Sequence, residues 1–160
     1  MTWNIVTDSS CDLFPSRDKD EQVKVSSVPF IISVGHQDFV DDETLDVPAM
    51  LEAMEKEPSA SHTSCPSPQA WLTQFEQSDN IIALTISSQL SGSMNSAQIA
   101  KELALEQYPE KKIEVLDSRS TGPELALCVE KIKGWIESGD DFEQVIERAA
   151  SFFQKTHIMF

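Results

Sequence analysis

The segment Ile81-Ile82-Ala83-Leu84-Thr85-Ile86-Ser87-Ser88-Gln89-Leu90-Ser91-Gly92-Ser93 joins an uninterrupted apolar run to a turn rich in hydroxyl side chains. The apolar run predicts a buried strand, since parallel strands covered on both faces are apolar throughout. A helical pattern follows from Met94, so the turn opens a helix. The first turn of a helix offers free backbone N–H groups and the positive end of the helix dipole. The segment therefore predicts an α/β fold with a turn that could receive an anion.

The rest of the chain alternates apolar strands with amphipathic helices. The expected strands lie at 4–7, 24–34, 80–86 and 113–116, with a short hairpin arm at Phe39-Val40. Pro29 lies inside 24–34, so this strand is expected to be bent or at the edge of the sheet. The expected helices lie at 46–56, 68–77 and 93–106, and two more fill the last third of the chain. Residues 12–20 and 57–67 are expected to be loops or short turns. This alternation predicts a mostly parallel sheet flanked by helices on both faces, a Rossmann-like architecture.

The helix patterns also predict which faces are apolar. Met50, Leu51 and Met54 form the apolar side of the first helix, and Ala97, Ala100, Leu103 and Ala104 point inward from the third.

A second hydroxyl-rich turn has the sequence Thr63-Ser64-Cys65-Pro66-Ser67-Pro68. Ser67 is a favourable N-cap, and Pro68 suits the first position of a helix. Either turn could bind an anion or could simply cap its helix, and the residues alone leave both interpretations open. Because ligands bind at the carboxyl ends of parallel strands, the Asp8-Ser9 and Asp117-Ser118 turns are expected near 87–93. Asp8 could form its own turn, orient neighbouring hydroxyls, or do both.

Composition excludes several classes of function. The chain has 160 residues, 40% of them hydrophobic, with a net charge of −15 and a pI near 4.4. Such a charge disfavours binding to nucleic acid and to anionic membrane surfaces. No apolar run approaches the roughly 20 residues that a transmembrane helix needs. Three widely spaced cysteines indicate free thiols and a cytoplasmic protein.

Catalytic and metal motifs receive little support. Cys65 precedes a capped helix, but no His–Asp pairing is visible from the spacing, so we expect no catalytic residue. His62 and Cys65 have no complementary pair of ligands elsewhere, and we expect no metal. The chain contains neither a nucleophile elbow nor a phosphate loop.

Four motifs occur together in order: 5–13 (IVTDSSCDL), 63–68 (TSCPSP), 87–93 (SSQLSGS) and 115–118 (VLDS). This set resembles that of the DegV family, bacterial fatty-acid-binding proteins with two domains. The resemblance covers the N-terminal domain of that family, so we expect this domain at 1–155 and the start of a second domain at 156–160. The family often has a small or Gly-rich stretch where this chain has Thr121-Gly122-Pro123-Glu124.

The resemblance implies a binding protein with no cofactor rather than an enzyme. It implies that Thr63 and Ser91 hold the carboxylate of a long-chain fatty acid for an ATP-binding fatty-acid kinase subunit. The residues expected to line the same site are Asp8, Ser9, Ser64, Gly92, Ser93 and Ser118. Two alternatives remain: a phosphoryl- or acyl-transfer enzyme using the 87–93 turn as an anion cradle, and an acidic protein-interaction domain.

Overall fold

The computed structural model describes residues 2–13 and 22–156. The predictions for 14–20 and for 157–160 lie outside these residues. A four-stranded parallel sheet forms the centre of the chain, with strand order β2-β1-β6-β7. Its strands are β1 (Trp3–Asp8), β2 (Val23–Val28), β6 (Asn80–Thr85) and β7 (Lys112–Asp117). β6 pairs with β1 on one side and with β7 on the other, both in parallel, so the predicted adjacent parallel strands are confirmed.

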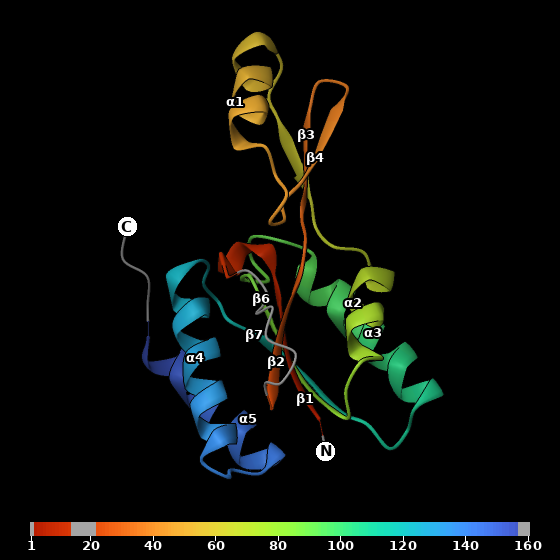
Figure 1. Cartoon of the computed structure of the whole chain (residues 1–160), viewed down its shortest axis with the longest axis vertical. Helices are drawn as coiled ribbons and strands as arrows, with labels where there is room; N and C mark the ends of the chain where they lie inside the picture. Colours follow the sequence, from red (N-terminus) through yellow and green to blue (C-terminus); the bar gives the residue numbers. More distant parts are fainter. Residues whose placement is uncertain (1, 14–21, 157–160) are drawn as a thin grey trace.

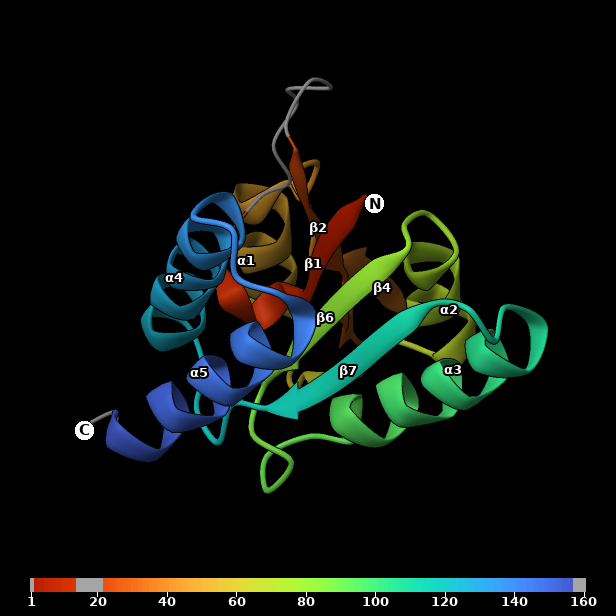
Figure 2. The same ribbon diagram turned by 90° about the horizontal axis from the view of Figure 1, so that it is seen from below.

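Helices cover both faces of this sheet, as predicted (Figure 2). On one face, α2 (Pro68–Phe75) and α3 (Ser93–Gln107) pack on Val6, Ile81 and Val115. On the other face lie α4 (Pro123–Glu137) and α5 (Phe142–Lys155), which bury Ile82 and Leu84. Each strand of the sheet thus divides its side chains between two apolar cores. No helix among the described residues is long and apolar enough to cross a membrane.

The helix starts follow the predicted capping chemistry. Asp46, Ser67 and Asp141 each accept a hydrogen bond from a backbone N–H three residues later in the chain. The N-terminus of α3 differs, because its N-cap is Gly92, which has no side chain to satisfy the first-turn N–H groups.

A small arm projects from the end of the molecule where β2 ends and β6 turns into α3 (Figure 1). It consists of β3 (Ile31–Val34), β4 (Gln37–Val40), α1 (Val47–Lys56) and β5 (His62–Ser64). The three strands form an antiparallel sheet of order β4-β3-β5, which confirms the predicted hairpin at Phe39-Val40.

Several predictions about local structure were wrong. Residues 24–34 form two strands in different sheets rather than one strand, since the chain leaves the parallel sheet at Pro29, which has no N–H to donate to a ladder. The first of these strands, β2, does lie at the edge of the parallel sheet, as expected. The expected loop at 57–67 contains strand β5, whose pairing partner β3 lies about 30 residues earlier. Leu103 does not point inward but is 40% exposed. The apolar side of α1 is only partly covered, because this helix has no buried residue and its Leu51 is exposed.

Candidate functional site

A cavity of about 490 Å³ lies where the arm meets the parallel sheet. Thr63 and Ser64 of β5 line it from the arm, and Ser91 and Gly92 line it from the turn that follows β6. The remaining lining residues are Phe30, Cys65, Ile86 and Leu90. None of these side chains carries a charge. The structure therefore brings the two hydroxyl-rich turns of the sequence to one concave surface.

The hydroxyl groups in this cavity are free to donate. Among the described residues, the side chains of Thr63 and Ser64 make no hydrogen bond, and both residues are exposed. The Oγ of Ser91 accepts a hydrogen bond from the backbone N–H of Ser93 at 3.2 Å, which leaves its own O–H available. Three O–H donors thus face a cavity that also receives the N-terminus of α3, whose N-cap Gly92 has no side chain. Such an arrangement suits an anion with several oxygen acceptors.

Asp8 lies beneath this cavity and organises the turn. Its carboxylate accepts hydrogen bonds from Ser10 Oγ at 2.6 Å, from Ser93 Oγ at 2.6 Å and from the Ile86 N–H at 2.9 Å. Asp8 and Ser93 are both fully buried. Burial raises the pKa of Asp8, and the hydrogen bonds from Ser10, Ser93 and Ile86 oppose that shift. The structure therefore places Asp8 and Ser93 as supports of the turn rather than on the cavity surface.

Gly92 lies where the two hydroxyl-rich turns meet. A Cβ atom on Gly92 would lie 3.4 Å from Cys65 Sγ, within ordinary van der Waals contact. The φ of Gly92 is −77°, so neither the backbone nor this contact requires a glycine here. Cys65 is half-buried, and its sulfur lies 4.0 Å from Ser96 Oγ. Of the described residues, no three His, Cys, Asp or Glu side chains gather as a metal site.

Ser9 and Ser118 lie apart from the cavity of Thr63 and Ser91. Ser9 Oγ donates to Asp41 Oδ2 at 2.6 Å and accepts from the Phe30 N–H at 3.1 Å, so it fastens the base of the arm. Ser118 is buried, and its hydroxyl is held by the backbone of Ser120. The carboxyl ends of the strands do meet at one edge of the sheet. The turns that follow β6 and β7 there also line a second cavity, next to the first.

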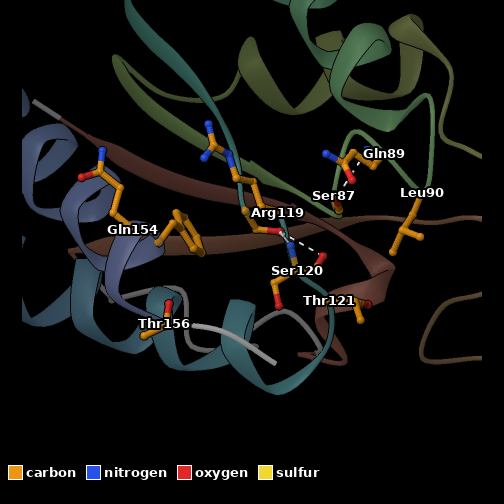
Figure 3. A pocket seen from close by; sticks show the side chains of 10 residues that line it. Ser87, Gln89, Leu90, Arg119, Ser120, Thr121, Gln154 and Thr156 are labelled. Atoms are coloured by element: carbon orange, nitrogen blue, oxygen red, sulfur yellow. Dashed lines mark hydrogen bonds between the residues drawn. The ribbon is translucent and has the colours of Figure 1, made fainter. Parts of the chain in front are cut away.

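The second cavity has a volume of about 390 Å³ and lies between the β6 and β7 turns and the end of α5 (Figure 3). Ser87, Gln89 and Leu90 line one side, Gln154 and Thr156 the other, and Arg119 projects between them. Phe153 adds an aromatic wall.

Sequence reasoning missed the apolar part of the site. Leu90 lines both cavities although it is 68% exposed. Leu90 gave no clear signal in the sequence, because single exposed apolar side chains are common on protein surfaces. The sequence did not indicate that Phe30 lines the cavity, since this depends on β3 of the arm beginning at the next residue.

Comparison with known proteins identifies the relationship. A family model described as "Uncharacterised protein, DegV family" matches residues 2–160. A DegV domain-containing protein of Streptococcus pneumoniae (strain R6) is 44% identical over 160 residues, which cover all of this chain and 57% of that protein. The chain belongs to the DegV family. It spans little more than half the length of the curated relatives it matches.

Solved structures of DegV relatives share the fold. One is the Streptococcus pneumoniae fatty acid kinase (Fak) B3 protein loaded with linoleic acid, with a TM-score of 0.92 and 44% identity over 97% of this chain and 55% of that one. Another is a DegV family protein from Eubacterium eligens loaded with heptadecanoic acid. Its TM-score is 0.89, and it is 36% identical over 96% of this chain and 54% of that one. The expected α/β fold of DegV type is therefore confirmed.

Proposed function

We propose that this DegV chain binds the carboxylate of a long-chain fatty acid in the cavity between the arm and the β6–α3 turn. One observation carries the proposal: the hydroxyls of Thr63, Ser64 and Ser91 line a single cavity, and none donates to an acceptor among the described residues. Relatives with this fold are loaded with linoleic and heptadecanoic acids, which supports the same class of ligand here.

A carboxylate fits these donors better than a polyanion does. The cavity offers hydroxyls and a helix N-terminus but no cationic side chain among its lining residues. One negative charge can be satisfied by two or three O–H groups and the helix dipole, whereas a triphosphate would need cations as well. The net charge of −15 further disfavours a highly charged ligand.

The acyl tail leads from this cavity over Leu90 into the second cavity. Leu90 is the residue that lines both, and Phe153 on α5 offers an apolar surface beyond it. Each methylene group removed from water there contributes about 0.8 kcal/mol, so the tail dominates affinity while the hydroxyls fix the orientation. Ser118 lies next to the tail rather than the carboxylate in this arrangement.

The protein supplies binding and orientation, and a separate ATP-binding fatty-acid kinase subunit phosphorylates the carboxylate. Two observations support this division. The relative with 44% identity is a fatty acid kinase (Fak) B3 protein, and no side chain lining the cavity here is a carboxylate, histidine or lysine that could act as a general base. We place the protein in the cytoplasm, where its three free thiols are stable.

Titration of the protein with linoleic acid tests the proposal. Thr63→Ala or Ser91→Ala should weaken binding by about 0.5–3 kcal/mol, the range for losing a hydrogen bond, which is larger when the partner is charged. Ser61→Ala is the matched control, since Ser61 is an exposed residue beside β5 whose side chain makes no hydrogen bond within the described part of the chain and which lines neither cavity. Wild-type affinity in the Thr63/Ser91 double variant would contradict the proposed carboxylate site.

A further inference from the structure

The arm contains a helix that buries none of its residues. Helices α2, α3, α4 and α5 each bury three or more residues, whereas α1 buries none although it contains Val47, Met50, Leu51 and Met54. Val47 is 46% exposed and Leu51 is 52% exposed, and they lie four residues apart on one side of the helix. Val40, at the end of β4 on the same arm, is 41% exposed. Val47 and Leu51 thus leave an apolar strip of a projecting helix open to solvent, as is typical of a protein-binding surface.

The same arm carries a large share of the negative charge. Residues 31–64 contain eight Asp or Glu and one Lys, so about a fifth of the chain holds nearly half of its net charge of −15. On α1 itself, Glu52 pairs with Lys56, and Glu55 has no ion-pair partner among the described residues. An apolar strip with an acidic surround favours a partner whose surface combines an apolar anchor with basic residues.

The arm also lies beside the proposed carboxylate site. Its strand β5 supplies Thr63 and Ser64 to the cavity, and Phe30 immediately before β3 lines the same cavity. Figure 1 shows α1 and the β3–β4 hairpin standing beyond the end of the parallel sheet where that cavity lies. A protein held by the arm would therefore lie at the same end of the molecule as the cavity.

We propose that the acidic and apolar surface of α1, formed by Val47, Leu51 and Glu55, docks a basic surface of the enzyme that phosphorylates the bound carboxylate. This inference rests on the proposed function. The negative charge of the arm argues against other binding partners. A second copy of this chain would bring the same excess of negative charge, and nucleic acid or an anionic membrane would be repelled. The arm then positions the enzyme at the carboxylate end of the ligand.

The test measures acyl phosphate formation on the linoleic-acid-loaded protein by the ATP-binding kinase subunit from the same organism. The arm variant is Val47→Ser/Leu51→Ser. The matched control is Leu103→Ser/Leu127→Ser, which removes two exposed apolar side chains from α3 and α4 on the body of the molecule. We expect the arm variant to raise the apparent KM for the loaded protein by about tenfold, with kcat and linoleic acid affinity unchanged. The wild-type KM should also rise with salt concentration, since basic and acidic surfaces are brought together.

Two results would overturn the docking surface: an arm variant whose KM stays within about twofold of wild type, or a control variant whose KM rises as much. Hydrogen exchange gives an independent readout, because α1 should gain protection in the loaded protein when the kinase subunit is added, and no added protection would count against the proposal. A failure of the proposed function looks different, since the wild-type protein would then not bind linoleic acid at all.

Discussion

Replacement of Ser93 by alanine tests how the β6–α3 turn is held. The Ser93 hydroxyl donates to the buried Asp8 carboxylate at 2.6 Å, and both residues are fully buried, so no water can take over the lost bond. Removing one partner of a buried hydrogen bond costs about 1–3 kcal/mol, and we expect Ser93→Ala to lower the free energy of unfolding by about 2 kcal/mol at about pH 7. For a chain of this size that corresponds to a fall in Tm of about 4–8 °C.

The cost of Ser93→Ala should depend on pH. Burial raises the pKa of Asp8 above its usual 3.8, so the folded protein holds that proton more tightly than the unfolded chain does. The stability gained from protonated Asp8 is therefore present at low pH and is lost as pH rises from 3.8 through the raised pKa. The Ser93 bond offsets part of this loss, because it lowers the pKa of Asp8. In acid the bond is neutral and contributes about 0.5–1.5 kcal/mol, so the variant should differ from wild type by about 1 kcal/mol there.

Urea unfolding followed by tryptophan fluorescence at about pH 4 and about pH 7 measures both values. Ser33→Ala is the control, because Ser33 Oγ donates to Asp38 at the same 2.6 Å but at an exposed position. That change should stay within about 0.5 kcal/mol at either pH. If Ser93→Ala cost the same in acid and at neutral pH, Asp8 would not be the titrating partner and the reasoning would fail.

Three further predictions concern the thiols, the core and the ligand. Burial raises the pKa of Cys11 to about 11 and that of Cys128 to about 12, so iodoacetamide should label the half-buried Cys65 first. Peptide mass spectrometry measures the order of labelling, and faster labelling of either buried thiol would contradict the fold. Leu125 is fully buried, so Leu125→Ala should lower the free energy of unfolding by about 2–5 kcal/mol. Leu127, two residues along α4, is half exposed, so Leu127→Ala should lower it by under about 0.5 kcal/mol. Equal losses in denaturant-induced unfolding would refute this prediction. The affinity for saturated fatty acids should rise about fourfold per methylene group until the tail is covered, and calorimetry showing no dependence on chain length would argue against a buried tail.

The parallel sheet and the helix caps could be predicted because their signals are local. A run such as 81–86 is apolar because helices cover both faces of its strand, and a residue such as Asp46 or Asp141 caps a helix only three positions away. The arm could not be predicted in the same way. Strand β5 has three exposed residues and forms only because β3, far away in the sequence, offers it an edge. Pro29 is evident in the sequence, but whether it bends a strand or ends one depends on the pairing of β3 with the distant β5.

The sequence indicated the hydroxyl chemistry of the candidate site, but not which of its residues line the cavity and which support those residues from behind. Two hydroxyl-rich turns, each before a helix, were visible in the sequence, and the family resemblance pointed to Thr63 and Ser91 within them; the structure has both residues lining one cavity. The roles of Asp8 and Ser93 depend on a contact between residues 85 positions apart, so sequence alone could not separate a residue on the cavity surface from one that supports it. Leu90 shows the converse, since its exposure can be understood only when both cavities are known.

A carboxylate held by neutral hydroxyls differs chemically from one held by arginine. A guanidinium neutralises the anion and takes both of its oxygens in a bidentate pair, which leaves little electron density for attack on phosphorus. Hydroxyls and a helix N-terminus orient the carboxylate while it keeps its full charge, so one oxygen can remain a nucleophile. Among the described residues, the cavity of Thr63, Ser64 and Ser91 is lined by donors of this weaker kind. Replacing Ser64 by arginine should therefore tighten fatty-acid binding and slow acyl phosphate formation, and a variant in which both rose together would refute this view of how the hydroxyls hold the carboxylate.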